Sequence, residues 1–293
     1  MKRICLIGLG EVGRVLAEDL LAGGGVALSA WDPKLAEPGS APARAAAELD
    51  IRPGRDAIDA VQGAALVVSA VTAAQTVDAA RAAAAGMAEG AVFLDLNSAS
   101  PAAKIGATAK VSAVGGLYVE GAVMSPIAPK RIASPILLGG PHARAFETEA
   151  RALGFAGARF YAEEPGKAAA AKLCRSVIVK GMEALLAESL LAARSYGVEG
   201  DVVASLDDLF PGPDWRRLSR YMISRSIEHG VRRAEEMAEA ARTVSQAGLD
   251  PLMSLATVDR QRWASRFGDQ LAHEELEPFL SDLLEQARGR GRG

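Results

Sequence analysis

The 293-residue sequence is poor in cysteine. Its two cysteines, Cys5 and Cys174, are too few for a disulfide framework or for a zinc site built on cysteines. Both lie among apolar neighbours, so we expect buried free thiols in a reducing compartment. The sequence therefore gives no reason to expect a disulfide-stabilised fold or a metal site.

Long hydrophobic runs and an excess of basic charge are also absent. No stretch approaches the roughly 18 apolar residues of a membrane-spanning helix. The apolar run at residues 4–7 is too short for the hydrophobic region of a signal peptide and ends in glycines. The net charge of −3 does not indicate a basic surface for nucleic acid. We therefore expect a soluble, cytoplasmic protein that binds neither a membrane nor nucleic acid.

Hydrophobic residues make up 49% of the chain and charged residues 24%, which is typical of a globular protein with a sizeable core. The length is that of two domains. Through residue 162, short apolar runs alternate with stretches of helical periodicity. The runs that we predict as strands are residues 3–8, 26–30, 65–71, 91–96, 136–138 and 158–161. Such strands, separated by helices, indicate βαβ units and a parallel sheet covered on both faces.

From Pro165 onward the pattern is helical. Residues 167–196 form one continuous helical stretch that ends at a glycine. Further helices are predicted at 214–222, 226–247, 251–267 and 277–286, and no strand is predicted after residue 162. The predicted fold class is α/β, with a doubly wound, Rossmann-type sheet in residues 1–162 and an all-helical domain in residues 163–293.

The strongest local motif is a glycine-rich turn between the first predicted strand and the first predicted helix. It consists of Gly8, Leu9, Gly10, Glu11, Val12 and Gly13. Gly8 allows the tight turn, Gly10 lets the backbone approach a pyrophosphate, and Gly13 permits close packing of helix on strand. The helix N-terminus adds free N–H groups and a partial positive charge. This context predicts a dinucleotide site, and a turn without any ligand is the alternative.

Asp32 lies nineteen positions after the last glycine of this motif, at the end of the second predicted strand. Its carboxylate would accept hydrogen bonds from the ribose hydroxyls and would repel a 2′-phosphate, which favours NAD. Lys34 and Arg55 could offset that preference, so NADP stays open. A turn-forming role is the alternative for Asp32. Val71 and Thr72, at the end of the third predicted strand, are further predicted cofactor contacts.

Four blocks of sequence carry a family resemblance. They are the glycine motif and residues 95–101 (Asp-Leu-Asn-Ser-Ala-Ser-Pro), 120–126 (Glu-Gly-Ala-Val-Met-Ser-Pro) and 166–176 (Gly-Lys-Ala-Ala-Ala-Ala-Lys-Leu-Cys-Arg-Ser). In this order they resemble the β-hydroxyacid dehydrogenase superfamily, which includes 3-hydroxyisobutyrate and 6-phosphogluconate dehydrogenases. Within it, the chain is most similar to a bacterial branch with a C-terminal domain of unknown function, DUF1932. The resemblance covers essentially the whole chain, and relatives of this kind dimerise through the helical domain.

The second and third blocks are implied to surround the reacting groups. In the second, Ser98 falls on a hydroxyl residue that lies near the nicotinamide and the substrate in relatives. A helix-capping segment is the alternative, and both roles can coexist. In the third, Val123, Met124 and Ser125 fall where relatives present donors to a substrate carboxylate. Met124 has no hydroxyl and Pro126 has no N–H, which departs from the family pattern.

The resemblance places Lys172 of the fourth block on the catalytic lysine, and Ser176 replaces an asparagine. Lys172, Ser176 and Lys180 are also spaced four residues apart, so they share one face of the long helix. That helix is hydrophobic almost all round, which predicts burial, and lysines are rarely buried without a function. A solvated helix face is the alternative. We predict Lys172 as the acid/base and Ser176 and Lys180 as substrate contacts, with Ala168 and Ala169 small enough to let a ligand approach.

The predicted function is NAD(P)-dependent hydride transfer between the nicotinamide and a hydroxy acid or related alcohol or carbonyl compound, and we expect the substrate to be anionic. The lysine takes the hydroxyl proton, or returns it in the reverse direction. One alternative is an imine reductase on the same fold, although imine reductases generally replace the lysine. The other is a sensor or assembly protein that binds NAD(P) without turnover. A homodimer is expected from the resemblance.

A dense polar patch in the helical domain allows two interpretations. Arg232 or Arg233 could clamp a substrate carboxylate through both guanidinium nitrogens. They could equally pair with Glu236 or Asp207 on a neighbouring helix, which is the interpretation that we favour. No role is assigned to His229.

Overall fold

The structure is a computed structural model that describes residues 1–268 and 273–290. Contacts between residues divide the chain into two compact units, Met1–Lys172 and Leu173–Gly293. The expected boundary between residues 162 and 163 stays a prediction. It coincides with the end of the last strand, whereas the division by contacts falls inside the helix that follows.

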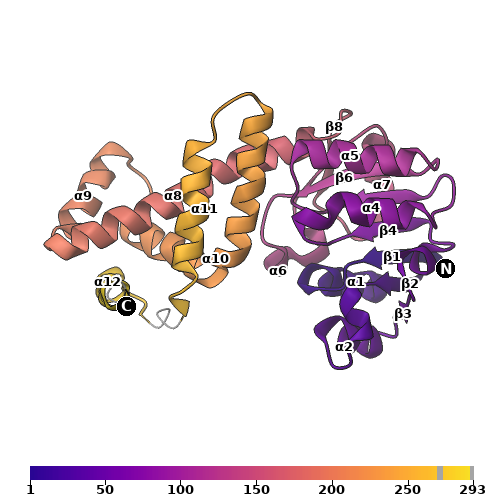
Figure 1. The fold of residues 1–293 in the computed structure, drawn as a ribbon, viewed down its shortest axis with the longest axis horizontal. Helices are drawn as coiled ribbons and strands as arrows, with labels where there is room; N and C mark the ends of the chain where they lie inside the picture. Colours follow the sequence, from indigo (N-terminus) through magenta and orange to yellow (C-terminus); the bar gives the residue numbers. More distant parts are fainter. Residues whose placement is uncertain (269–272, 291–293) are drawn as a thin grey trace. The chain divides into compact units, whose positions relative to one another are not determined.

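The first unit contains an eight-stranded sheet (Figure 1). Its strands are β1 (Lys2–Ile7), β2 (Val26–Trp31), β3 (Arg52–Pro53), β4 (Leu66–Ser69), β5 (Val92–Asp95), β6 (Leu117–Val123), β7 (Ile136–Gly139) and β8 (Ala158–Ala162). They are ordered β3-β2-β1-β4-β5-β6-β7-β8, and all neighbours are parallel except β6 and β7. The chain order reverses between β1 and β4, which is where ligands bind in sheets of this kind.

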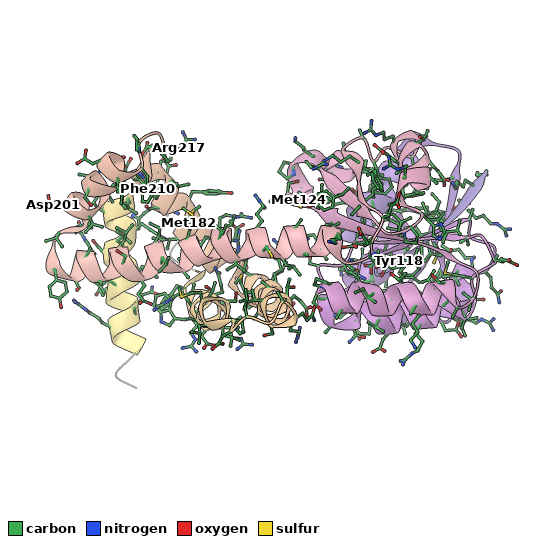
Figure 2. All side chains as sticks on the ribbon, turned by 90° about the horizontal axis from the view of Figure 1, so that it is seen from above. Tyr118, Met124, Met182, Asp201, Phe210 and Arg217 are labelled. Carbon is green, nitrogen blue, oxygen red and sulfur yellow. The ribbon has the colours of Figure 1, made fainter. Side chains whose placement is uncertain are left out.

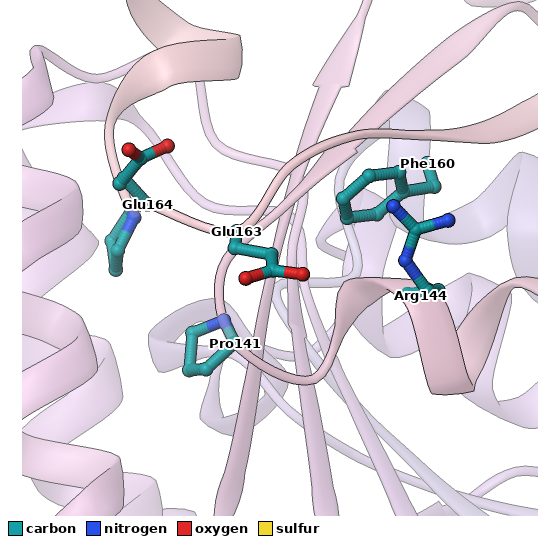
Figure 3. A pocket seen from close by; sticks show the side chains of 6 residues that line it. Pro141, Arg144, Phe160, Glu163 and Glu164 are labelled. Carbon is teal, nitrogen blue, oxygen red and sulfur yellow. The ribbon is translucent and has the colours of Figure 1, made fainter.

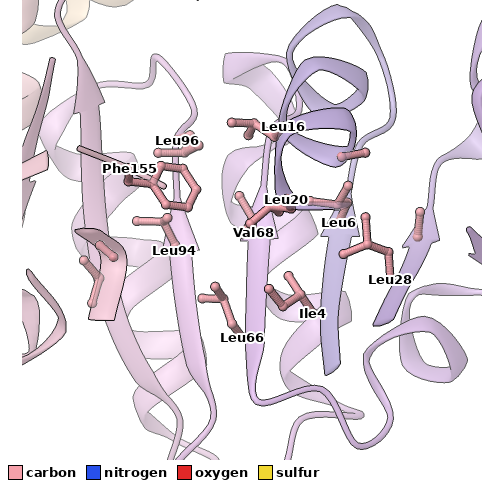
Figure 4. Close-up of a cluster of buried hydrophobic side chains, with 14 of the residues drawn as sticks. Ile4, Leu6, Leu16, Leu20, Leu28, Leu66, Val68, Leu94, Leu96 and Phe155 are labelled. Atoms are coloured by element: carbon pink, nitrogen blue, oxygen red, sulfur yellow. The ribbon is translucent and has the colours of Figure 1, made fainter. Parts of the chain in front are cut away.

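Helices cover both faces of this sheet. They are α1 (Glu11–Gly23), α2 (Ala41–Glu48), α3 (Ala57–Val61), α4 (Thr76–Ala84), α5 (Pro101–Ser112), α6 (Ile127–Lys130) and α7 (Ala143–Ala152). Successive residues of a strand point to opposite faces. Ile4 and Leu6 of β1 pack with Leu16 and Leu20 of α1 in the first core (Figure 4), whereas Cys5 and its alternate neighbours pack under α3, α4 and α5. The α/β fold class predicted from the sequence is confirmed.

The second unit is helical throughout its described residues. The helices are α8 (Lys167–Tyr196), which begins in the first unit, α9 (Glu199–Leu209), α10 (Trp215–Gln246), α11 (Leu252–Ala264) and α12 (Leu276–Arg290). Its core joins aliphatic and aromatic side chains of all five helices. In residues 1–268 and 273–290, no helix combines the length and the apolar content needed to cross a bilayer.

Several predictions about local structure were wrong. β6 and the two-residue β3 were not predicted as strands, and neither α2, α3 nor α9 was predicted as a helix. The helices predicted at 214–222 and 226–247 are one helix, α10, because nothing in residues 223–225 breaks the turn. Cys5 is a buried free thiol as predicted, but Cys174 is exposed, because it lies on the outer side of α8.

Candidate functional site

The glycine motif forms the turn from β1 into α1. Gly8 has a φ of 93°, and a Cβ there would lie 2.5 Å from the carbonyl oxygen of Ala70 at the end of β4. A Cβ on Gly13 would lie 2.1 Å from the carbonyl oxygen of Gly8. A Cβ on Gly10, by contrast, would meet nothing within 4 Å. The first and third glycines therefore permit close packing, and the second leaves open space at the N-terminus of α1, which fits a pyrophosphate.

Asp32 connects this turn to the end of β2. One carboxylate oxygen accepts the backbone N–H of Leu9 at 3.0 Å, and the other accepts the N–H of Lys34 at 2.9 Å. The second contact caps the short 3-10 helix Pro33–Ala36. The turn-forming alternative for Asp32 is therefore realised in the structure. Each carboxylate oxygen has more than one lone pair, so these contacts leave acceptor capacity for ribose hydroxyls.

The predicted cofactor contacts Val71 and Thr72 follow β4, next to β1 in the sheet. The side-chain oxygen of Asn97, which follows β5, accepts the N–H of Val71 at 2.7 Å. The Asn97 amide also donates to Ser69 at 3.0 Å. β1, β4 and β5 are parallel, so their carboxyl ends, and the residues after them, lie along one edge of the sheet.

Ser98 and Lys172 meet within the first unit. The Nζ of Lys172 donates a hydrogen bond to the Oγ of Ser98 at 2.5 Å, across 74 residues of sequence. Ser98 follows β5, on the same edge as the glycine motif, and Lys172 lies in the second turn of α8. The structure thus brings together the serine and the lysine that the sequence pointed to independently.

Val123 is the last residue of β6, and Met124 and Ser125 follow it. The N–H of Met124 donates to the carbonyl of Pro135 at 2.8 Å, and its side chain packs against a small cluster of Ala122, Leu137 and Ala168. Ser125 is directed to the carbonyl of Pro126 at 3.2 Å. Ala168 and Ala169 are buried, and Ala168 packs against Ala122 and Leu137 of the sheet. That their small size lets a ligand approach stays a prediction.

Ser176 and Lys180 belong to the second unit. The Nζ of Lys180 donates to Ser176 at 3.2 Å and lies 2.8 Å from a carboxylate oxygen of Glu236 on α10. Arg233 pairs with Glu183 of α8, at 2.5 and 2.6 Å, and not with Glu236 or Asp207. The prediction of a structural pair is confirmed, but its partner was wrong, because packing places Glu183 beside Arg233 and Lys180 beside Glu236.

Two family models match the chain. The NAD binding domain of 6-phosphogluconate dehydrogenase matches residues 3–163, more than half of the chain. The chain belongs to the β-hydroxyacid dehydrogenase family. A domain of unknown function, DUF1932, matches residues 193–264. This family member therefore combines an NAD(P)-binding domain with the helical domain that its sequence resembled. Among curated proteins, no match was found.

Solved structures share the fold over nearly the whole chain. A conserved hypothetical protein from Sinorhizobium meliloti 1021 is 36% identical, with a TM-score of 0.80, and the match covers 97% of this chain and 96% of that one. The 3-hydroxyisobutyrate dehydrogenase of Mycobacterium tuberculosis, solved with L-serine, is 18% identical (TM-score 0.71, 97% and 99% covered). An imine reductase of Streptomyces aurantiacus is 20% identical (TM-score 0.58, 97% and 99% covered). The last two show a common fold alone.

A buried polar network, which we did not predict from the sequence, lies beside Asn97 and Ser98 in this protein. Asp95, fully buried, accepts the Nζ of Lys104 at 2.8 Å, the hydroxyl of Tyr118 at 2.8 Å and the N–H of Asn97 at 2.9 Å. Figure 2 labels Tyr118, whose pKa burial raises well above its ordinary value. Burial also raises the pKa of Glu120, although the charge of Lys104 opposes the shift. The contact with Asn97 is local, but Lys104 and Tyr118 come from α5 and β6, so no single local pattern signals the whole network.

A surface pocket of about 510 Å³ lies elsewhere in the first unit (Figure 3). It is lined by Pro141, Arg144, Phe160, Glu163, Glu164 and Pro165. The guanidinium of Arg144 lies 3.8 Å from the centre of the Phe160 ring. The pocket includes none of the predicted site residues. In the described residues, no group of three or more histidine, cysteine, aspartate or glutamate side chains is arranged to hold a metal ion.

Proposed function

We propose that this family member is an NAD-dependent oxidoreductase that interconverts a small hydroxy acid, or a related alcohol, and its carbonyl form. The contact of Lys172 with Ser98 carries the proposal. It sets an amine and a hydroxyl 2.5 Å apart, in the same unit as the dinucleotide motif and on the edge of the sheet where that motif lies. An acid/base and an orienting hydroxyl at that edge are what hydride transfer to or from a C–OH group requires.

In this proposal Lys172 moves the proton and Ser98 orients the reacting oxygen. The neutral amine of Lys172 takes the hydroxyl proton during oxidation, and its ammonium form returns it during reduction. When bound, the nicotinamide exchanges a hydride with the substrate carbon. Val123, Met124 and Ser125 form one side of the proposed substrate region. Ser176 and Lys180 are proposed to contact an anionic substrate.

The proposed cofactor is NAD, because Asp32 presents a carboxylate at the end of β2, where a 2′-phosphate would be repelled. Arg55, which could have offset this charge, pairs with Asp59 at 3.2 Å. Lys34 stays the nearest candidate for accommodating NADP. The open space at Gly10 and the helix N-terminus at Glu11 fit the pyrophosphate of either dinucleotide.

A homodimer is also proposed, through the helical unit. Large apolar side chains are exposed on α8 and α11, among them Ile178, Leu185, Leu252 and Met253. Exposed apolar side chains on neighbouring elements are typical of a contact surface. Sedimentation velocity at micromolar concentration should give the mass of a dimer, and a monomer would contradict the proposal.

Replacing the lysine tests the chemistry. Hydroxy acids of increasing chain length are first screened with NAD⁺ and with NADP⁺ to find a substrate. Lys172→Ala is then expected to lower kcat by about 10²–10⁴-fold, because no other group takes the proton. The matched control is Lys167→Ala, an exposed lysine five residues earlier on α8. Unchanged turnover in Lys172→Ala would refute the lysine mechanism.

Replacing Asp32 tests the cofactor site. Trp31, adjacent to Asp32, is the fluorescent reporter for titration with NADH and NADPH. Asp32→Ala is expected to weaken NADH binding by about tenfold or more, because the ribose hydroxyls lose a charged acceptor. If the protein instead prefers NADPH, NADP would be the cofactor, and Lys34 would be the residue expected to bind its 2′-phosphate. Binding of neither dinucleotide would refute the dehydrogenase proposal at its first step.

The same measurements separate the two alternative functions. The imine reductase fold makes a cyclic imine with NADPH the first comparison substrate. Reduction of the imine, and no turnover of any hydroxy acid, would favour that alternative. Tight NADH binding without any turnover, and unchanged by Lys172→Ala, would favour a protein that binds the dinucleotide without catalysis.

A further inference from the structure

Glu120 is a fully buried carboxylate whose hydrogen bonds go to the main chain at the start of α8. One oxygen accepts the N–H of Gly166 at 2.6 Å, and the other accepts the N–H of Ala169 at 2.5 Å. These are two of the four N–H groups at the start of α8 that have no partner within the helix. Such groups are usually capped by a side chain of the same segment. Here the cap comes from β6, 46 and 49 residues away in sequence.

The sheet is built to admit this carboxylate. Glu120 pairs with Asp95 on one side and with Gly139 of β7 on the other. A Cβ on Gly139 would lie 2.9 Å from a carboxylate oxygen of Glu120, so the glycine leaves the room that the carboxylate occupies. Burial raises the pKa of Glu120, which means that the charged carboxylate is held there at a cost in free energy. The hydrogen bonds from the N–H groups of Gly166 and Ala169 oppose this shift and favour the charged carboxylate.

What it holds is the turn that precedes Lys172. Lys172 lies three residues after Ala169, which places it one turn further along α8. Gly166, with a φ of 90°, packs on Pro101, where a Cβ would lie 3.0 Å from the proline Cβ. Pro101 in turn begins α5, directly after the segment of Ser98. The two hydrogen bonds to Glu120 therefore fix the position and the rotation of the first turn of α8 relative to the sheet. They thereby fix the position of the Lys172 Cα, from which its side chain extends.

We propose that Glu120 is a positioning residue that holds Lys172 against Ser98 by capping α8 from the sheet. This inference rests on the proposed function, in which Lys172 exchanges the proton. Glu120 acts through the main chain of α8 and takes no part in the proton transfer. Its loss should therefore change the environment and effectiveness of Lys172 and leave the dinucleotide site on the other strands unaltered.

Two variants disturb the cap in different ways. Glu120→Gln has one acceptor oxygen, and its NH₂ group faces the second N–H. Gly139→Ala keeps the carboxylate but crowds it with a methyl group. Glu199→Gln, another buried glutamate, on α9 in the second unit, is the matched control. NADH affinity, measured with Trp31 fluorescence, should stay within about twofold of wild type in all three.

The first readout needs no substrate. Each protein is treated with a limiting dose of acetic anhydride, and acetylation is measured by peptide mass spectrometry at Lys172 relative to the exposed Lys110 in the same sample. In Glu120→Gln and Gly139→Ala, relative labelling of Lys172 is expected to rise about fivefold, since its hydrogen bond to Ser98 is weakened. The second readout is turnover, where kcat should fall about ten- to a hundredfold with the KM for the cofactor unchanged.

The outcomes are decisive in each case. Raised labelling of Lys172 in both variants, with NADH binding retained, supports the positioning role even if no substrate is found. Unchanged labelling of Lys172 in both folded variants overturns it. Loss of NADH binding in both variants also overturns it, because Glu120 would then hold the whole sheet and not Lys172. Failure of the proposed function shows separately, as unchanged turnover in Lys172→Ala.

Discussion

Glu120 of the first unit and Glu183 of the second unit are both buried glutamates, but their carboxylates bind different partners. Glu120 of the first unit is fully buried and is bonded to backbone N–H groups. Glu183 of the second unit, 3% exposed, is bonded to the guanidinium of Arg233 and to the amide of Gln261 at 3.1 Å. A carboxylate on main chain fixes the position of an element, whereas a carboxylate on side chains joins elements that are already formed. We therefore expect Glu120 to determine where α8 lies on the sheet, and Glu183 to contribute to the free energy of unfolding of the second unit.

The largest effect on stability is expected from replacing Lys104, whose charge acts on Glu120. Lys104 is 1% exposed and pairs with Asp95 at 2.8 Å. Lys104→Met should lower the free energy of unfolding of the first unit by about 3–5 kcal/mol, since it leaves the Asp95 charge buried without a cation. Urea unfolding followed by Trp31 fluorescence measures the loss. Lys110→Met, an exposed lysine on the same helix, is the control. A loss no larger than in this control would show that the pair is not sealed from water.

A smaller effect is expected from Glu183. Glu183→Gln keeps one acceptor oxygen but turns an NH₂ group toward a donor of Arg233 or Gln261, so the second unit should lose about 2 kcal/mol through a buried unsatisfied donor. Urea unfolding of the second unit, followed by Trp215 and Trp263 in a Trp31→Phe background, measures it. NADH affinity should not change. A change in NADH affinity would break the distinction between the two glutamates.

The smallest effect is a dependence on pH. Burial raises the pKa of Glu183, while the charge of Arg233 opposes the shift. A raised pKa means that the folded protein binds this proton more tightly than the unfolded chain does, so stability is lost as pH rises from the ordinary glutamate value of about 4.3 through the folded value. The stability advantage of wild type over Glu183→Gln should therefore shrink across that window. Unfolding midpoints in a pH series test it, and an advantage that grows with pH would mean that the pKa is lowered.

The sequence predicted most where the chemistry is local. The turn at Gly8, Gly10 and Gly13 is a pattern of six residues, and its structure follows from glycine geometry alone. The sheet followed from continuous apolar runs, which are read without knowledge of their partners. The resemblance pointed to Ser98 and to Lys172 separately, and the structure joins them by a hydrogen bond.

The rest depended on packing between distant segments. β6 escaped prediction because Glu120 and Gly121 interrupt its apolar run, and only the cap on α8 explains a charge at that position. The partner of Arg233 is fixed by which helix packs against α10, and Glu183 lies fifty residues away. Lys104 reads as a solvated helix residue until Asp95 is known to lie beneath it. Ion pairs buried between elements leave no periodic signal in a single sequence.

Asp32 has a consequence for redesign of this protein. Its two oxygens tie the glycine turn, through Leu9, to the start of the short helix at Lys34. In an engineering campaign toward NADPH, exchanging this aspartate would remove the proposed repulsion of a 2′-phosphate and, in the same step, release the turn that is proposed to bind the pyrophosphate. The side chain of Lys34 takes no part in these two hydrogen bonds, because only its backbone N–H donates to Asp32. Substitutions at Lys34 and the residues after it, with Asp32 kept, could therefore change the preference between NADH and NADPH without releasing the glycine turn.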